Sequence, residues 1–304
     1  MRKTLFLFCF ISLFIPALSH AQYAGPQSGQ KVAFLGDSIT AYGYGHPSGY
    51  VQLVAKALEK EGTPITIIPA GISGNTSKDM LARLDKDVID KKPDWMTLSC
   101  GVNDVWHADK GGVPFDQYQK NITEIVDKAQ AAGIKVVILT STMIMEDQST
   151  DFNQKLTQYN DFLKSLAKEK GIPVADLNAA MQAEVTEEKA KMPNVKGPLL
   201  TVDGVHMNPV GDQMMATGIL KAWGITDAQM ADILPVWNEM NSGVTATVNP
   251  NLTVNQYLQL RALAASKGTT VNDMISDAAK TDVLNLLKEP VPAATSAAPA
   301  AKSP

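Results

Sequence analysis

Short apolar segments alternate with longer segments of helical periodicity between residues 31 and 222, and this alternation limits the fold more than any other feature of the sequence. Each apolar segment has the length of a buried strand, whereas the segments between them repeat apolar residues three or four positions apart, as amphipathic helices do. Strands joined by helices form a parallel sheet, which is covered by helices on both faces. We therefore predict an α/β fold with parallel strands at Lys31–Gly36, Ile65–Pro69, Asp94–Ser99, Ile134–Thr140 and Pro173–Ala175.

Local signals indicate how the connecting segments are built. Ser48 is predicted to cap a helix, and Asn208 followed by Pro209 is typical of the start of the last helix in this region. Residues 37–47 are rich in glycine and are predicted to form a loop that holds Tyr42, Tyr44 and His46. The segment from residue 176 to residue 196 is interpreted only as a polar stretch.

Polar residues follow several of the predicted strands. Right-handed crossovers put the carboxyl end of every strand at one edge of the sheet, which is where open α/β sheets place their chemistry. Ser38 follows the first strand, Gly74 the second and Asn103 the third, while Asp203 and His206 lie in the loop before the last helix. We therefore expect these residues to converge although they are far apart in the sequence.

The residue types at this edge suit nucleophilic catalysis. A serine hydroxyl becomes a good nucleophile when a base takes its proton, and an imidazole is the usual base. His206 is predicted to be the base for Ser38, with Asp203 accepting the Nδ1 proton. The backbone N–H groups of Ser38 and Gly74 and the side-chain amide of Asn103 are predicted to form an oxyanion hole.

Four short motifs occur in order along the chain: Gly36-Asp37-Ser38, Ser73-Gly74-Asn75-Thr76, Gly101-Val102-Asn103-Asp104 and Asp203-Gly204-Val205-His206. Together they resemble the signature blocks of the SGNH, or GDSL, hydrolase family of serine esterases, over residues 31–222. The resemblance implies a flavodoxin-like three-layer α/β/α sandwich with a five-stranded parallel sheet, and esterase activity without a cofactor. It also implies that the catalytic residues are Ser38, His206 and Asp203 and that the oxyanion hole contains Gly74 and Asn103.

Several other residues at this edge are candidate substrate contacts. For Asp37, hydrogen bonds to backbone groups of neighbouring loops are the favoured alternative, and Asp104 is interpreted in the same way. Trp106 and Tyr44 either form a wall on which a sugar stacks or only cover the rim. His46 and His107 are also candidate substrate contacts, but a position facing solvent or behind the contacting residues is favoured for them. No His/Cys/Asp cluster has metal-ligand spacing, so no metal site is predicted.

The amino terminus has the pattern of a secretory signal peptide. The basic pair Arg2-Lys3 precedes an apolar segment from Leu5 to Leu18, and small residues stand at Ser19 and Ala21. We predict that residues 1–21 are removed and that the protein is exported to the periplasm or the medium. Their removal takes the net charge from −4 to −6, because two basic residues are lost, so nucleic acid is not an expected partner. The segment is too short for a stable membrane anchor.

The hydrolase region is predicted to span residues 22–224, and a mainly helical extension to follow at 225–288. Within it, residues 225–241 are predicted to form a helix with Leu234 facing inward, and Val244–Val248 alternates like a strand. The order strand, helix, glycine, helix is weakly similar to ribbon-helix-helix dimerisation modules. The extension is therefore predicted either to pack on the hydrolase region or to pair two subunits in a homodimer. The Pro/Ala-rich segment 289–304 is predicted to be disordered.

Two classes of function remain open at this stage. The first is an exported serine esterase that acts on a small ester or an acylated carbohydrate, with a carbohydrate O-acetylesterase favoured over a lysophospholipase or thioesterase. The reason is that the sequence lacks a long apolar lid segment of the kind that lipid substrates favour. The second is a non-catalytic module that presents the glycine-rich edge to a glycan. The presence of Ser38, Asp203 and His206 together favours the esterase.

Overall fold

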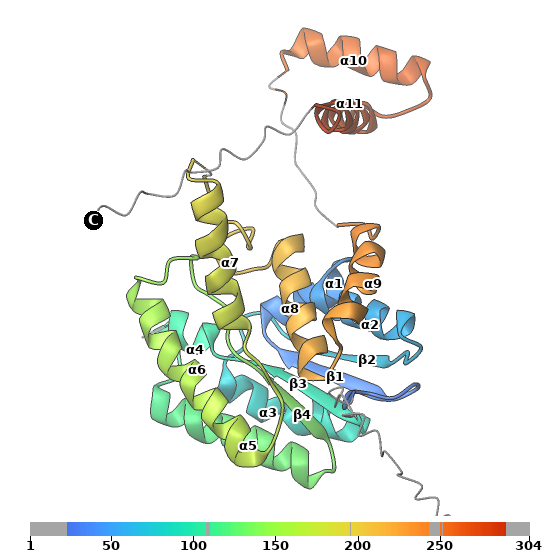
Figure 1. The fold of residues 1–304 in the computed structure, drawn as a ribbon. Coiled ribbons are helices and arrows are strands. Elements are labelled where there is room, and N and C mark those ends of the chain that lie inside the picture. The colour runs from blue at the N-terminus through green and yellow to red at the C-terminus, as the bar shows by residue number, and fades with distance from the viewer. Residues whose placement is uncertain (1–22, 108–109, 195, 243–249, 251, 290–304) are drawn as a thin grey trace, which may run out of the picture.

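The computed structural model describes residues 23–107, 110–194, 196–242, 250 and 252–289. At its centre is a five-stranded parallel sheet in the order β2-β1-β3-β4-β5 (Figure 1). This confirms the flavodoxin-like α/β fold, for which the order is typical. The strands are β1 (Lys31–Gly36), β2 (Thr66–Gly71), β3 (Trp95–Ser99), β4 (Lys135–Leu139) and β5 (Val174–Ala175).

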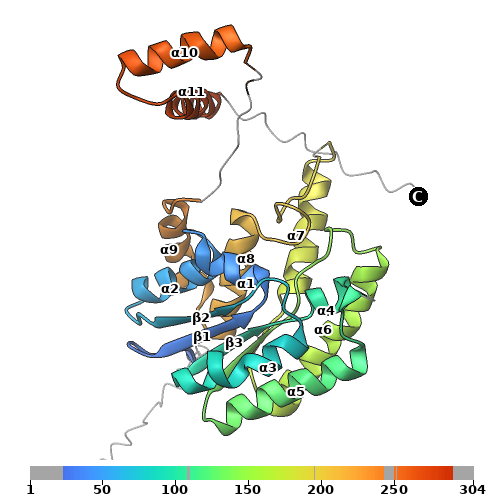
Figure 2. The same ribbon diagram turned by 180° about the vertical axis from the view of Figure 1, so that it is seen from behind.

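Helices cover both faces of the sheet, as Figures 1 and 2 show from opposite sides. One face carries α2 (Tyr50–Lys60) and α8 (Pro209–Ala222), and the other carries α3 (Ser77–Asp87), α5 (Phe115–Ala131) and α6 (Asp151–Lys170). The central strands are therefore buried on both sides, which explains why they are mainly apolar. A 3-10 turn, Ile89–Lys91, precedes β3.

The strand order reverses at β1, and this reversal positions the candidate site. From β1 the chain moves outward to β2 and then returns to β3 on the other side of β1. The loops that follow β1 and β3 therefore leave the sheet in different directions, which opens a crevice at their carboxyl ends. Ser38 follows β1, and Asn103 follows β3 in the short helix α4 (Val102–Trp106).

The predicted loop after β1 is instead a helix, α1 (Ser38–Gly45). One of its glycines serves close packing, because a Cβ on Gly43 would lie 2.4 Å from the Tyr50 ring; a Cβ on Gly49, at the start of α2, would lie 2.4 Å from the Gly43 carbonyl oxygen. The glycine content therefore reflects the approach of α1 to α2. The prediction that Ser48 caps α2 was also wrong, because α2 begins at Tyr50 with Gly49 at the cap position.

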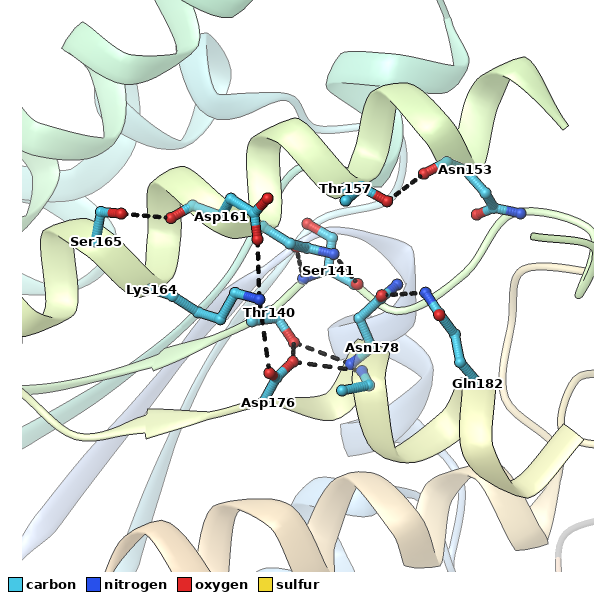
Figure 3. Close-up of polar contacts among 12 residues, drawn as sticks. Thr140, Ser141, Asn153, Thr157, Asp161, Lys164, Ser165, Asp176, Asn178 and Gln182 are labelled. Carbon is cyan, nitrogen blue, oxygen red and sulfur yellow. Dashed lines mark hydrogen bonds and ion pairs between the residues drawn. The ribbon is translucent and has the colours of Figure 1, made fainter. Parts of the chain in front are cut away.

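The polar stretch after β5 contains a helix that the sequence analysis missed, α7 (Leu177–Lys191). Only a narrow line of its side chains is buried, so its apolar periodicity is weak. Figure 3 shows how its start is fixed: the Thr140 hydroxyl after β4 donates to Asp176 over 3.1 Å and accepts from the backbone N–H of Asn178 over 2.9 Å. The N-terminus of α7 is thus bonded to the carboxyl end of β4.

The carboxyl-terminal region has two parts. Helix α9 (Asp227–Asn238) packs on α2, and the indole of Trp237 is buried and donates to the Leu53 carbonyl oxygen over 2.9 Å. These contacts join α9 to the α/β body, although the predicted extension began at residue 225. Leu234 is 38% exposed, so the prediction that it faces inward was wrong.

Helices α10 (Val254–Ser266) and α11 (Val271–Leu286) contact each other and form a separate pair in Figure 1. The predicted strand at 244–248, the predicted signal peptide and residues 290–304 of the predicted tail lie outside the described residues. Among the helices that are described, none combines the length and the apolar character needed to cross a membrane.

Candidate active site

The structure brings Ser38, His206 and Asp203 together in one chain of hydrogen bonds. Ser38 is the first residue of α1, and its Oγ lies 2.8 Å from Nε2 of His206. On the other side of the imidazole, Nδ1 lies 2.7 Å from Oδ2 of Asp203. With Nδ1 protonated, Nε2 is free to accept the serine proton, so the arrangement is suited to nucleophilic attack by Ser38.

The loop that carries Asp203 and His206 is held in shape by the carboxylate of Asp203. Oδ1 of Asp203 accepts the backbone N–H groups of Val205 and His206 over 3.0 and 2.8 Å, while Gly204 takes a positive φ of 96° that favours glycine. Partial burial tends to raise the pKa of Asp203, but the hydrogen bonds from His206 and Val205 outweigh it. The pKa of this carboxyl therefore lies below its ordinary value, so the group is ionised at neutral pH.

Ser38 is positioned by the strand-to-helix turn. The Asp37 side chain caps α1 by accepting the N–H of Ile39 over 2.9 Å, so the cap bond goes to the residue after the serine. Gly36 makes the turn possible, because a Cβ there would lie 2.0 Å from Oγ1 of Thr40. Ser38 is 9% exposed, which leaves its hydroxyl at the edge of the buried core.

The other two predicted oxyanion donors come from loops that are bonded to one another. Asn103 is buried, and its Nδ2 donates to the Asn75 carbonyl oxygen over 3.0 Å and lies 3.5 Å from Oδ2 of Asp37. Gly74 precedes Asn75, has a positive φ of 79° and has open space where a Cβ would be. The loop after β2 and helix α4 therefore bring a permissive glycine and a side-chain amide toward the same turn.

A model of the GDSL-like lipase/acylhydrolase family matches residues 34–214, which is more than half of the chain and includes all four motifs. The chain belongs to this family. It is therefore an esterase of the GDSL type, a carboxylic ester hydrolase.

Relatives of this GDSL hydrolase include acetylesterases and other esterases. An acetylxylan esterase from Geobacillus stearothermophilus is 29% identical over 217 residues, which cover 65% of this chain and 95% of the relative. Esterase TesA from Pseudomonas aeruginosa is 37% identical over 111 residues, which cover 36% and 53%. The crystal structure of the acetyl xylan esterase AlAXEase is 32% identical, covers 63% of this chain and 98% of its own, and has a TM-score of 0.59.

The structure of the G. stearothermophilus acetylxylan esterase Axe2 is similar to the same extent, with 28% identity and a TM-score of 0.59, and it covers 66% of this chain and 96% of its own. Variants of Axe2 described as catalytic mutants replace a serine, an aspartate or a histidine by alanine. In Axe2 that aspartate precedes the histidine by three positions.

Arg83 in α3 organises the GDSL hydrolase site, and the sequence analysis missed it. One guanidinium nitrogen donates to the carbonyl oxygens of Gly36 and Ala70 over 2.9 and 2.8 Å, and Nε donates to Oδ1 of Asn75 over 2.6 Å. A further bond, 3.0 Å long, pairs it with Asp87. Arg83 thus joins the turn before Ser38 to the loop of Gly74. No sequence signal marks it, because two of its four partners are backbone carbonyl oxygens brought near by the fold.

Two buried aspartates also join the loops of the site. Oδ1 of Asp104 accepts the N–H and the hydroxyl of Ser77 over 2.9 and 2.6 Å, which ties α4 to the start of α3. Burial raises the pKa of Asp104, although the bonds from Ser77 oppose the rise. Burial likewise raises the pKa of Asp37 to about 6, against the opposing effect of its bond from Ile39.

Aromatic side chains lie beside His206, and one of them, Tyr42, was not among the predicted substrate contacts. The ring of Tyr42 lies 4.7 Å from that of His206, and His46 stacks on Tyr42 at 5.5 Å. Tyr42 is four residues after Ser38 on the same face of α1, so it would have been a candidate had this segment been predicted as helix. Tyr42 is 43% exposed, and Tyr44 is exposed as well.

The two remaining candidates, Trp106 and His107, lie at the end of α4, the helix that carries Asn103. Trp106, the last residue of α4, is half-buried against the core, and its ring lies 6.4 Å from that of His107. Among the ring contacts of the described residues, Trp106 and His107 pair with each other, and Tyr42 pairs with His206. The role of Trp106 and His107 as substrate contacts stays a prediction. Within the described part of the chain, no group of three or more His, Cys, Asp or Glu side chains has the arrangement of a metal site.

Proposed function

We propose that this GDSL hydrolase is an O-acetylesterase that uses Ser38 as nucleophile. Ser38 Oγ forms a bond to the ester carbonyl carbon while its proton passes to Nε2 of His206. The negative charge on the carbonyl oxygen is met by the N–H groups of Ser38 and Gly74 and by the amide of Asn103. The C–O bond to the alcohol then breaks, and the His206 proton goes to the departing oxygen.

The second half of the reaction repeats these roles with water. His206 takes a proton from water, whose oxygen attacks the acyl carbon, and the bond to Ser38 Oγ breaks as His206 returns the proton to it. The observation that carries this proposal is the continuous chain from Ser38 Oγ through the imidazole to Asp203, with distances of 2.8 and 2.7 Å. Catalytic variants of Axe2 at the same three residue types, with the same three-residue spacing of aspartate and histidine, support it.

We propose further that the alcohol part of the substrate is a carbohydrate. His206 gives its proton to the departing alcohol, so this part of the ester lies next to the imidazole, where the exposed Tyr42 and His46 rings are stacked. An aromatic surface with polar edges suits a sugar, which presents both C–H groups and hydroxyls. The acetylxylan esterases that match 65% and 63% of this chain support the same substrate class.

Export is part of the same proposal. The basic start, the apolar segment and the small residues before Gln22 support removal of residues 1–21, and a polysaccharide substrate would be met outside the cytoplasm. Expression of the full chain in a bacterial host, fractionation and amino-terminal sequencing test this. We expect mature protein that begins at Gln22 outside the cytoplasm, and full-length protein found only in the cytoplasm would refute export.

A substrate panel tests the catalytic proposal. We expect hydrolysis of 4-nitrophenyl acetate and acetate release from acetylated xylo-oligosaccharides, with little activity on the corresponding octanoate or palmitate esters. Ser38→Ala should lose activity by about 10⁴-fold or more while remaining folded. A fluorophosphonate should label the wild type and not this variant. A clear preference for long acyl chains would favour a lysophospholipase or thioesterase and refute the acetylesterase.

A further inference from the structure

We propose that Glu146 is a positioning residue for Asp203 and His206, and this inference rests on the proposed function. Glu146 lies outside the four motifs, in the segment that follows β4, and it is 4% exposed. Both Met145 and Glu146 have positive φ angles, 61° and 48°, a conformation that residues other than glycine rarely adopt. Surrounding contacts therefore have to hold this backbone in place.

Asparagine side chains from two helices supply these contacts. Asn160 in α6 exchanges two hydrogen bonds with the backbone of Ser141, over 2.8 and 3.0 Å, and Asn153 exchanges two with Ile144, over 3.0 and 2.6 Å. Asn178 in α7 donates to the Thr142 carbonyl oxygen. In Figure 3, Asn153 and Asn178 come from different helices on either side of the segment that holds Ser141. The chain that leads to Glu146 is thus fixed at three points.

The Glu146 carboxylate binds the segment just before Asp203. Its oxygens accept the N–H of Leu199 over 2.7 Å, the N–H of Leu200 over 2.9 Å and the hydroxyl of Thr201 over 2.6 Å. Since the Thr201 proton is donated to Glu146, a lone pair of the same hydroxyl oxygen is directed to the N–H of Gly204, 3.1 Å away. A continuous path therefore runs from Glu146 through Thr201 to Gly204, the residue after Asp203.

The neighbour of Glu146 fixes the other side of Gly204. The N–H of Met145 donates to the Gly204 carbonyl oxygen over 2.7 Å, and a Cβ on Gly204 would lie only 2.6 Å from Sδ of Met145. At the base of the loop, the N–H of Val202 donates to the His206 carbonyl oxygen over 2.8 Å. The catalytic loop is thus closed on itself and bonded through Gly204 to the chain of Met145 and Glu146.

This arrangement explains how a solvent-exposed aspartate keeps a precise position. The Asp203 side chain is 49% exposed, so packing alone does not hold it. His206 has to meet Asp203 and Ser38 at once, and small displacements of catalytic groups are costly, about 100-fold in rate for about 1 Å. Glu146 therefore holds the loop of Asp203 and His206 at the distance from α1 at which His206 bonds both Asp203 and Ser38.

Kinetics of Glu146→Gln and Thr201→Val with 4-nitrophenyl acetate test the proposal. The first substitution would turn an N–H group toward backbone donors, and the second would remove the hydroxyl. We expect each variant to lower kcat by about 10- to 100-fold with KM within about twofold of wild type. The double variant should lose little more than either single one, because both break the same path. Thr201→Ser, which keeps the hydroxyl, should keep kcat within about threefold.

Leu156→Ala, in the buried face of α6, is the stability control. It should lower the melting temperature at least as much as Glu146→Gln while leaving kcat unchanged. A kcat within twofold of wild type in Glu146→Gln, multiplicative losses in the double variant, or an equal loss in Leu156→Ala would overturn the proposal. If Glu146→Gln does not fold, the contrast between Thr201→Val and Thr201→Ser decides. Activity that persists in Ser38→Ala refutes the proposed function instead, so the two failures are distinguishable.

Discussion

Nε2 of His206 lies 2.8 Å from Oγ of Ser38, although 168 positions separate the two residues in the chain. The contact exists because β1 and the loop before α8 both end at the carboxyl edge of one parallel sheet. Asp203 on the same loop sets the orientation of the imidazole over 2.7 Å. Substitution of individual residues of the site separates their effects on kcat.

Asp203→Asn is expected to lower kcat by about 10³- to 10⁴-fold. The amide no longer accepts a hydrogen bond from Nδ1 of His206, so the imidazole is not held in the tautomer whose Nε2 accepts the serine proton. KM for 4-nitrophenyl acetate should change little, since Asp203 does not face the ester. Steady-state kinetics test this, with Asp161→Asn on the exposed face of α6 as the control. A loss below tenfold would contradict the role of Asp203.

Asn103→Ala removes one of the proposed oxyanion donors and should lower kcat by about 10²- to 10³-fold. Because the Asn103 amide also bonds the Asn75 carbonyl oxygen, the melting temperature has to be measured alongside. A folded variant whose only change is a higher KM would show that the amide contacts the ground state and not the tetrahedral intermediate.

Arg83→Lys is expected to impair both stability and activity. A lysine ammonium cannot reach Gly36, Ala70 and Asn75 in the directions that the planar guanidinium does. Lost hydrogen bonds of about 1–2 kcal/mol each predict a fall of about 2–3 kcal/mol in the free energy of unfolding, together with a lower kcat. Denaturant unfolding and kinetics measure these effects. Arg261→Lys in α10 is the matched control, and equal effects in both variants would refute the role of Arg83.

The buried carboxyl group of Asp212 should make the stability of the protein depend on pH. Burial raises its pKa to about 7, against the opposing bond from the Tyr50 N–H, so the folded state binds the proton more tightly than the unfolded state. The stabilisation of the folded state by this proton is fully present below about pH 4 and is lost as the pH rises through about 7. Asp212→Asn keeps an acceptor for Tyr50 without a charge. From pH 5 to pH 8 it should gain stability relative to wild type, up to about 3 kcal/mol at about 1.4 kcal/mol per pKa unit.

Thermal unfolding of Asp212→Asn and wild type at pH 5 and pH 8 measures this difference. Asp85→Asn, on an exposed side chain, serves as the reference for removal of one carboxylate. A constant difference between Asp212→Asn and wild type at both pH values would contradict the raised pKa.

Truncation after Ser242 tests the carboxyl-terminal helices. The pair α10 and α11 exposes Leu258, Leu263 and Leu286. Pairing of two subunits through this apolar surface stays a prediction. We expect kcat/KM within about twofold of the full chain, because α9 still packs on α2. The mass in solution, measured by light scattering, should fall from dimer to monomer. An unchanged oligomeric state would refute pairing through this extension.

The sequence predicted the strands well and the segments between them less well. β1 was predicted at its observed bounds, because a strand buried on both faces is a continuous apolar run with few alternative interpretations. Helices α1 and α7 were missed for opposite reasons. α1 contains a glycine, Gly43, that serves packing against Tyr50, and α7 buries too few side chains to show a clear periodicity.

By itself, the sequence determined the α/β class and the family and singled out the residues proposed to carry the chemistry, because these depend on local patterns and on four short motifs. Only the tertiary structure revealed Arg83 and Glu146 at the site and the contact of Tyr42 with His206. Their partners are mainly backbone atoms and rings from distant segments, and such contacts leave no periodicity in the chain. The folded sheet edge alone brings those groups within bonding distance, so their roles follow from geometry and not from residue order.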